Sequence, residues 1–164
     1  MKYPIYKGKV KLVRLEEKQF SLFYRWWNDK ALRRLTADST KKLSKQTIDG
    51  YLQKHLADEN IFDFIIVVGK KSIGHVLVQY KKRKKHFELY IAIGEKNYWG
   101  RGIGSVALRR AIRWFFRRFP HEKALYLEVL ATNTHAIACY DFVGFKRVRF
   151  VLRSKTILMR YQKR

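Results

Sequence analysis

A glycine-rich segment at residues 97–107, NYWGRGIGSVA, constrains the fold more than any other part of the sequence. Gly100, Arg101, Gly102 and Gly104 fall within five positions, between an apolar stretch and an amphipathic one. Small residues at such a junction let several backbone N–H groups converge at a helix N-terminus, where the helix dipole favours an anion. The segment predicts a strand–loop–helix unit whose loop binds phosphate, the alternative being a turn that only packs helix against strand.

Two widespread phosphate-binding loops fit this segment less well. No Lys followed by Ser or Thr comes after the last glycine, which excludes a P-loop. The pattern G-x-G-x-x-A beginning at Gly102, with Glu122 about twenty residues on, matches a loose dinucleotide fingerprint. In that fold the strand runs directly into the first glycine, whereas here residues 94–101 intervene. We therefore interpret the loop as a pyrophosphate site to which Arg101 adds positive charge.

The hydrophobic pattern on both sides of the loop predicts one mixed α/β domain over residues 1–164. Expected strands cover residues 10–15, 62–68, 72–80, 86–93, 124–130, 147–152 and 155–161. Expected helices cover residues 18–35, 44–56, 104–119 and 133–143. A helix between the strands at 86–93 and 124–130 predicts that these two are parallel neighbours.

Composition and cysteine content limit the class of protein. Apolar residues make up 47% and charged residues 30%, which is typical of a globular domain. The single cysteine, Cys139, excludes an internal disulfide and suits a reducing cytosol, so we expect a cytoplasmic protein. The N-terminus has no apolar signal region, and the longest aliphatic run, residues 65–68, is too short for a membrane span.

The charge balance is strongly basic, with 37 Lys and Arg against 13 Asp and Glu and a net charge of +24. Such a field attracts anions, including nucleotide cofactors, RNA and the ribosome, and it disfavours cationic substrates such as free polyamines and aminoglycosides. The run at residues 81–85 is either a contact for RNA or an acidic protein, or a solvated hairpin tip. One hypothesis is therefore an RNA- or ribosome-binding module with weak or lost catalysis.

A second motif, LEVLATNTHAIACYDFVGF at residues 127–145, follows the loop. Together the two segments resemble the GNAT superfamily of acyl-CoA N-acyltransferases. The loop is similar to the superfamily's Q/R-x-x-G-x-G/A motif, with Trp99 in place of the usual Gln or Arg. The second segment is similar to L-E-V-x-x-x-N-x-x-A-x-x-x-Y-x-x-x-G-F, which is matched by Asn133, Ala136, Tyr140, Gly144 and Phe145. Within the superfamily the sequence most resembles bacterial ribosomal-protein N-terminal acetyltransferases. The WWND segment at residues 26–29 adds to this resemblance.

The resemblance implies a fold and an activity. The fold would be GNAT-like, a central mixed, mostly antiparallel sheet of about six or seven strands flanked by helices. The activity would be transfer of an acetyl group from acetyl-CoA to a primary amine by direct attack. A protein N-terminal α-amine is the first acceptor we expect, and a small-molecule amine the second. A monomer and a homodimer both remain open. The reaction needs no metal, and no ligand spacing is seen among His55, His75, His86, His121 and His135.

The resemblance also assigns the residues that would bind acetyl-CoA. Backbone groups of Ile91, Ala92 and Ile93 would bind the pantetheine arm, and one strand amide would face the thioester oxygen. Asn133 would hold the arm from the opposite side. The pyrophosphate would lie on the loop formed by Trp99, Gly100, Arg101, Gly102, Ile103, Gly104 and Ser105.

Three side chains are candidates for proton transfer. Tyr140 would protonate the leaving thiolate, since a phenol with a pKa near 10 can share a proton with a thiol of pKa about 8.5. It lies two helical turns after Asn133 and so faces the same side, although it could simply pack its helix on the sheet. Glu88 and Glu128 each lie within an apolar strand, where a raised pKa would suit a base. A salt bridge is the alternative for both carboxylates, and the sequence does not choose between them.

Overall fold

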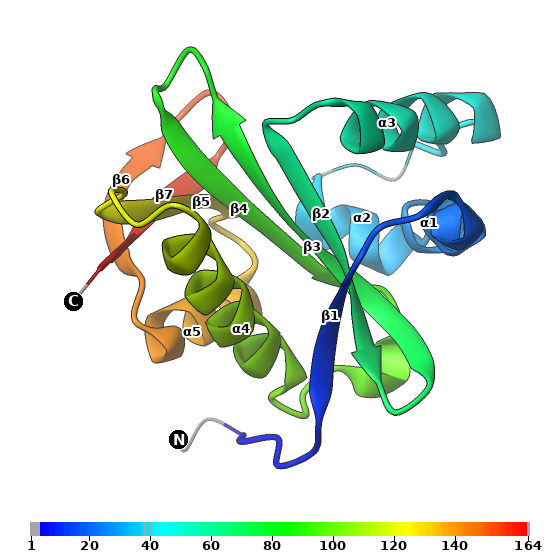
Figure 1. Cartoon of the computed structure of the whole chain (residues 1–164), viewed down its shortest axis with the longest axis horizontal. Helices are drawn as coiled ribbons and strands as arrows, with labels where there is room; N and C mark the ends of the chain where they lie inside the picture. The colour runs from blue at the N-terminus through cyan, green and yellow to red at the C-terminus, as the bar shows by residue number, and fades with distance from the viewer. Residues whose placement is uncertain (1–3, 38, 40, 164) are drawn as a thin grey trace.

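A seven-stranded sheet forms the centre of the computed structural model, with strand order β1-β2-β3-β4-β5-β7-β6 (Figure 1). Every neighbouring pair is antiparallel except β4 and β5, which are parallel as predicted. The mixed α/β class and the mostly antiparallel sheet are therefore confirmed. The structure describes residues 4–37, 39 and 41–163, so both ends of the domain predicted at 1–164 lie outside the described residues.

The strands and helices lie close to the positions that the hydrophobic pattern predicts. The strands are β1 (Val10–Arg14), β2 (Ile61–Val68), β3 (Lys71–Lys81), β4 (His86–Ile93), β5 (Ala124–Leu130), β6 (Lys146–Val151) and β7 (Thr156–Gln162). The α-helices are α1 (Phe20–Trp26), α2 (Lys30–Thr36), α3 (Lys45–Ala57), α4 (Ile103–Arg118) and α5 (Thr134–Val143). Two 3-10 turns, η1 (Glu17–Gln19) and η2 (Lys96–Tyr98), precede α1 and follow β4.

The single helix predicted over residues 18–35 is wrong, because the chain breaks between α1 and α2. Asp29 takes an extended conformation and its carboxylate accepts a hydrogen bond from the backbone N–H of Leu32, which starts a new helix. The Asn28 side chain is used in the turn, where it bonds both backbone groups of Leu43. Two short polar residues with local partners thus outweigh the continuous apolar pattern.

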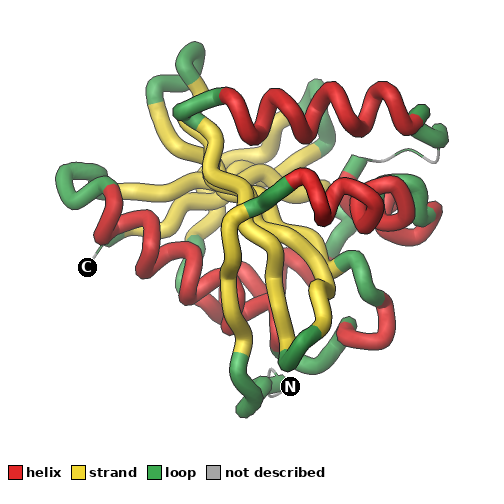
Figure 2. The backbone as a smooth tube through the Cα atoms, turned by 45° about the vertical axis from the view of Figure 1, so that its right-hand side comes forward, coloured by secondary structure: helices red, strands yellow, loops and turns green. Residues whose placement is uncertain are grey.

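Two hydrophobic clusters place helices on both faces of the sheet (Figure 2). The larger cluster joins the sheet to α4 and α5, with Phe115 and Phe145 fully buried. The smaller cluster joins the sheet to α1, α2 and α3, with Phe23 and Trp26 at its centre. Within the described part of the chain, none of the helices is both long enough and apolar enough to cross a bilayer.

The segment after β4 is tied to the N-terminal helices by polar side chains. Glu95 accepts hydrogen bonds from the indole of Trp26 at 2.9 Å and from Arg25, and Lys96 forms an ion pair with Asp29 at 2.6 Å. These contacts link α1 and the start of α2 to the entrance of the glycine loop. The loop and the N-terminal helices are therefore held in one arrangement.

Candidate functional site

The sheet opens between β4 and β5, and this opening forms the site. The two strands pair at one register position, Glu88 with Tyr126, while Ile91, Ala92 and Ile93 pair only with β3. A cavity of about 1210 Å³ lies along this part of β4. Its lining comes from β3, β4, the loop before α4 and the start of α4, the end of β5, α5 and the N-terminal helices. Because the β5 side of Ile91–Ile93 lacks a strand partner, its backbone groups are placed to bind an extended ligand.

The glycine loop forms one end of the cavity. Gly100 and Gly102 have positive φ angles of 71° and 76°, and Gly102 is the N-cap of α4. A methyl group on Gly102 would also lie 2.2 Å from the backbone oxygen of Pro4. Only glycine fits such a position without strain. The backbone N–H groups that begin α4 have no partner within the helix and so remain available for an anion.

Five of the seven predicted loop residues line the cavity, and two do not. The lining residues are Trp99, Gly100, Gly102, Ile103 and Gly104. The Arg101 guanidinium lies instead over the ring of Tyr98, 5.6 Å from its centroid. The buried hydroxyl of Ser105 donates to the backbone oxygen of Gly102 at 2.8 Å, which braces the first turn of α4. Any contribution of Ser105 to phosphate binding would therefore come from its backbone N–H.

Trp99 has a structural partner that its motif position did not suggest. Its indole N–H donates to the backbone oxygen of Ile93 at 2.7 Å. This bond joins the glycine loop to the last residue of β4. The indole therefore does not supply the phosphate contact that Gln or Arg would offer, and it instead sets the position of the loop relative to the strand.

Asn133 and Tyr140 both line the cavity from the α5 side, as their spacing predicts. The Asn133 side-chain oxygen caps α5 by accepting from the N–H of Ala136 at 3.1 Å. Its amide nitrogen donates to the backbone oxygen of Leu35 at 3.0 Å, which links α5 to α2 across the cavity. Tyr140 is 8% exposed, and its ring lies edge-on to that of Phe145, with centroids 6.0 Å apart.

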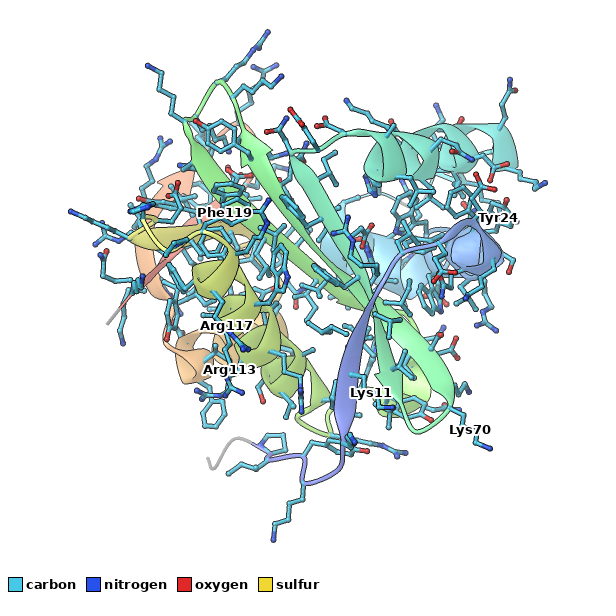
Figure 3. All side chains as sticks on the ribbon, in the orientation of Figure 1. Lys11, Tyr24, Lys70, Arg113, Arg117 and Phe119 are labelled. Carbon is cyan, nitrogen blue, oxygen red and sulfur yellow. The ribbon has the colours of Figure 1, made fainter. Side chains whose placement is uncertain are left out.

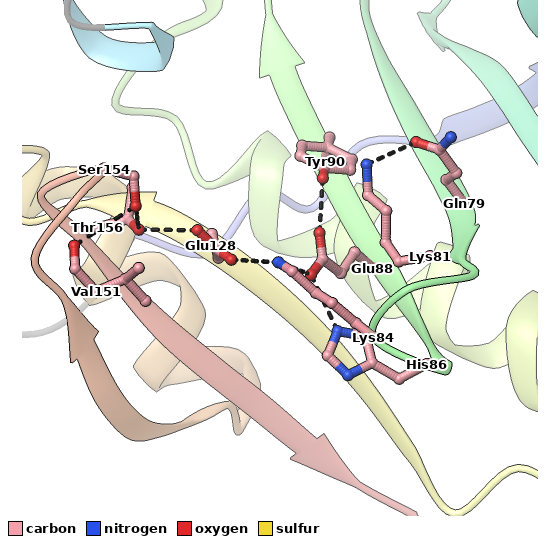
Figure 4. Close-up of polar contacts among 10 residues, drawn as sticks. All are labelled: Gln79, Lys81, Lys84, His86, Glu88, Tyr90, Glu128, Val151, Ser154 and Thr156. Atoms are coloured by element: carbon pink, nitrogen blue, oxygen red, sulfur yellow. Dashed lines mark hydrogen bonds and ion pairs between the residues drawn. The ribbon is translucent and has the colours of Figure 1, made fainter.

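The two candidate carboxylates, Glu88 and Glu128, are joined by one cation (Figure 4). The Lys84 ammonium lies 2.6 Å from Glu88 and 2.5 Å from Glu128. Glu88 also accepts from His86 at 3.0 Å and from Tyr90 at 2.7 Å, while Glu128 accepts from Thr156. The salt-bridge alternative is thus realised for both carboxylates.

The prediction that Glu88 has a raised pKa is wrong. Burial acts to raise the pKa of this carboxyl, but hydrogen bonds from Lys84, His86 and Tyr90 outweigh burial and hold the pKa below its usual value. Glu88 is 1% exposed and is not among the residues that line the cavity, whereas Glu128 is. Glu128 is therefore the better placed of the two to meet a ligand.

The basic residues outside the site are distributed over several elements. Figure 3 labels Lys11 on β1, Lys70 before β3, and Arg113 and Arg117 on α4, and all four are exposed. The run at 81–85 is not simply a solvated tip, because Lys84 bridges the two carboxylates. RNA or ribosome binding by these residues stays a prediction.

The other end of the cavity holds a cluster that sequence reasoning missed. Asp63 on β2 contacts the Nδ1 atom of His55 at 2.9 Å and that of His75 at 3.1 Å. Both histidines line the cavity together with Trp27 and Tyr51. The sequence offers a signal, since Asp63 is the one polar residue of β2 and His75 directly precedes the apolar residues 76–78 of β3. Metal-ligand spacing, the property by which the histidines were judged above, does not detect an Asp–His pair. Among the described residues no group of His, Cys, Asp or Glu is arranged to hold a metal ion.

Comparison with known proteins identifies the class of domain. Residues 9–146 match the family model described as "Acetyltransferase (GNAT) domain". A domain from Methanocaldococcus jannaschii DSM 2661 superimposes with a TM-score of 0.83 at 19% identity, over 96% of this chain and 100% of that one.

Two enzymes with bound ligands are also similar in fold. The aminoglycoside acetyltransferase AAC(6')-Ib in complex with coenzyme A and kanamycin has a TM-score of 0.81 at 18% identity, covering 94% of this chain and 95% of that one. The spermidine N-acetyltransferase of Vibrio cholerae in complex with CoA and spermine has a TM-score of 0.79 at 19% identity, covering 92% of each chain. At these identities the likeness establishes the fold.

We predict that Lys84→Met destabilises the protein at pH 7 by about 1–3 kcal/mol, because it leaves a buried carboxylate without its cation. The lowered pKa of Glu88 contributes stability above the pKa of its unfolded form, about 4.3, and this contribution is lost as the pH falls through the folded pKa. The deficit of Lys84→Met should therefore shrink below about pH 4. Urea unfolding at pH 7 and at pH 3.5 measures both effects.

Lys82→Met is the matched control, since Lys82 is exposed in the same turn. It should change the free energy of unfolding by less than about 0.5 kcal/mol. An equal loss in the two variants, or a deficit of Lys84→Met that does not depend on pH, would contradict the role assigned to Lys84.

Proposed function

The chain belongs to the GNAT acetyltransferase family, and we propose that it moves the acetyl group of acetyl-CoA to a primary amine by direct attack in the β4–β5 cavity. The observation that carries this proposal is the continuity of the cavity. It joins the amides of the glycine loop, the backbone edge of Ile91–Ile93 and the ring of Tyr140. A pyrophosphate, an extended pantetheine arm and a thioester are arranged in that order along acetyl-CoA.

Gly104 supports the placement of the pyrophosphate. Gly104 lies in the first turn of α4, and a methyl group there would meet only the sulfur of Cys139, at 3.8 Å. The fold therefore does not require glycine at this position, unlike at Gly102. Since Gly104 lines the cavity, the missing side chain leaves room for a ligand to approach the N-terminus of the helix.

The lining of the acceptor end favours an amine on an uncharged body. Glu128 is the one carboxylate among the described lining residues, and no Lys or Arg lines the cavity there. Trp27, Leu43 and Tyr51 supply apolar and aromatic surface instead. A polycation would need more carboxylates to replace its hydration. We therefore favour the α-amine of a peptide N-terminus, or a small amine with a neutral body, and assign to Glu128 the attraction of the incoming ammonium.

Tyr140 is the group we assign to protonation of the departing sulfur. It is largely buried on α5, lines the cavity and shares that wall with Asn133. A thiolate that leaves into a low-dielectric pocket is stabilised by a nearby O–H donor. The α-amine of a peptide has a pKa of about 8, so an appreciable fraction of this acceptor is neutral at pH 7.

We expect Gly104→Ala to weaken coenzyme A binding by about tenfold or more, because the added methyl group keeps the phosphates from the amides. The variant should be as stable as the wild type, or more stable, since alanine favours the helix. Gly50→Ala is the control: Gly50 is a helical glycine with nothing within 4 Å of the added carbon. Calorimetric titration with coenzyme A should separate the two, and equal affinity in Gly104→Ala and wild type would refute the phosphate site.

We expect Tyr140→Phe to lower the turnover number by roughly 100-fold or more while leaving coenzyme A affinity unchanged. Tyr161→Phe is the matched control, since Tyr161 packs on the same Phe145 but does not line the cavity. Turnover is followed by thiol release with a panel of acceptors: 2-phenylethylamine, a tetrapeptide with a free N-terminus, spermidine and kanamycin. Full turnover in Tyr140→Phe, with chemistry rate-limiting, would remove this residue from the mechanism.

The same panel tests the acceptor class. The proposal requires acetylation of the peptide or of 2-phenylethylamine in preference to spermidine and kanamycin. The reverse preference would overturn the assignment of an uncharged acceptor body. If no amine is acetylated and coenzyme A does not bind, the transferase proposal itself fails.

A further inference from the structure

We propose that His75 is the base that takes a proton from the acceptor amine, and that Asp63 and His55 position it. This inference rests on the transferase function proposed above and assigns the deprotonation step of that reaction. It is carried by a buried carboxylate with an imidazole on each oxygen, located at the acceptor end of the cavity.

The hydrogen bonds determine which ring nitrogen faces the cavity. Oδ1 of Asp63 contacts Nδ1 of His75 at 3.1 Å, and Oδ2 contacts Nδ1 of His55 at 2.9 Å. An ionised carboxylate only accepts hydrogen bonds, so each Nδ1 carries the proton. In the neutral form of either ring the lone pair is then on the opposite nitrogen, Nε2. Among the described residues neither Nε2 atom has a hydrogen-bond partner, and both histidines line the cavity.

The charge state of Asp63 supports this tautomer. Burial acts to raise the pKa of Asp63, but the two imidazoles outweigh burial, and the pKa lies below its usual value. The carboxylate is therefore ionised at neutral pH although its side chain is only 1% exposed. An ionised acid behind an imidazole stabilises the imidazolium that forms when the ring accepts a proton.

The sheet register places His75 beside the reacting part of the cavity. His75 on β3 lies directly opposite Ala92 on β4, and cross-strand neighbours of this kind have Cβ atoms about 4.5–5.5 Å apart. Ala92 is one of the three residues whose backbone would hold the pantetheine arm. Because its side chain is a single methyl group, space remains above it for an amine between the imidazole and the thioester.

Aromatic rings fix the orientation of both imidazoles. The His75 ring packs edge-on against Phe23, with centroids 4.9 Å apart, and lies 6.0 Å from Trp27. The His55 ring lies 6.2 Å from Trp27. These contacts hold the planes of the two rings, and the hydrogen bond of each Nδ1 to Asp63 fixes which edge of the ring faces the carboxylate. The Nε2 edge of each ring is thus preorganised on the side away from Asp63.

Other charged and titratable groups near the cluster do not take its place. Tyr51 on α3 and Tyr90 on β4 line the same cavity, and the Tyr90 hydroxyl donates to Glu88. Arg33 on α2 donates to the backbone oxygen of Trp27 at 3.2 Å. Glu88 and Glu128 share the Lys84 ammonium, so both carboxylates are already paired with a cation.

The proton balance of the step is complete with these groups. Nε2 of His75 takes one proton from the ammonium, and the lone pair released on nitrogen forms the C–N bond with the thioester carbon. The C–S bond breaks and the sulfur leaves with its electron pair. The attacking nitrogen then loses a second proton, and Tyr140 transfers a proton to the sulfur in its place. The first proton passes from His75 to solvent after the amide product leaves, so one proton is released for each acetyl group transferred.

The test compares an acceptor that needs a base with one that does not. 2-Phenylethylamine is an ammonium ion at pH 7, whereas hydroxylamine is neutral and attacks without prior deprotonation. In His75→Gln we expect turnover of 2-phenylethylamine, or of the panel amine that the wild type uses best, to fall about 10²- to 10⁴-fold. Turnover of hydroxylamine, after subtraction of the rate without enzyme, should stay within about threefold of wild type, and coenzyme A affinity should not change.

Companion variants and a spectroscopic measurement complete the experiment. Asp63→Asn should lower amine turnover similarly, because the amide favours the wrong tautomer. His55→Gln should cause a smaller loss, and His121→Gln, an exposed histidine outside the cavity, should cause none. Nitrogen NMR of the wild type at pH 7 should show protonated Nδ1 on His55 and His75, and in Asp63→Asn this signature should be lost.

Two results would overturn the inference. One is an equal loss with both nucleophiles in His75→Gln, which would indicate that the residue supports only the structure. The other is a wild-type spectrum with protonated Nε2 on His75, which needs no turnover and remains informative if His75→Gln fails to fold. Failure of the transferase proposal is distinguished from both, because it would appear as absent coenzyme A binding in the wild type.

Discussion

The single parallel contact between β4 and β5 determines where this molecule has a cavity. Glu88 pairs with Tyr126 there, and the ring of His86 stacks on that of Tyr126 at 4.2 Å. Lys84 joins the two strands by binding Glu88 and Glu128 together. Past this clamp, among the described residues, Ile91–Ile93 of β4 pair with a strand only on the β3 side. A sheet that stayed paired along its whole length would satisfy these backbone groups and leave no place for a ligand.

The cavity that results has two ends with different chemistry. At one end, glycines and a helix N-terminus offer backbone donors that suit phosphate oxygens. At the other end, Asp63 holds two imidazoles among aromatic rings. The two ends are kept at a set separation by bonds that cross between them, namely Trp26 to Glu95, Lys96 to Asp29 and Asn133 to Leu35. Catalysis by proximity needs two substrates to be held in a fixed relative orientation, and these bonds hold the two ends of the cavity in that way.

The protein as a whole is strongly basic, whereas the lining of its cavity is not. The chain carries a net charge of +24, yet among the residues that the structure describes no Lys or Arg lines the cavity. The outer surface can therefore attract an anionic donor such as a nucleotide-containing thioester from a distance. The interior then selects by shape, apolar surface and hydrogen bonding. Long-range attraction of an anion thus depends on the outer surface, and contact with the bound ligand depends on the cavity lining.

Local sequence patterns predicted the strands, the helix over residues 133–143 and the glycine loop before α4, because each depends on residues close together in the chain. They did not predict the break at Asn28 and Asp29, where side-chain bonds outweighed the apolar period. Nor did they show that Glu88 is held as a paired carboxylate, since its partners Lys84 and Tyr90 are recognised only once the hairpin and the strand faces are known.

What the sequence by itself determined is therefore the class of fold and the place of the glycine loop before α4. What only the tertiary structure decided is which polar side chains are paired. Asp63, His55 and His75 come from β2, α3 and β3, and none of these segments alone shows that the three side chains meet. Their hydrogen bonds exist because strand register and helix packing bring distant residues within about 3 Å, which no local pattern encodes.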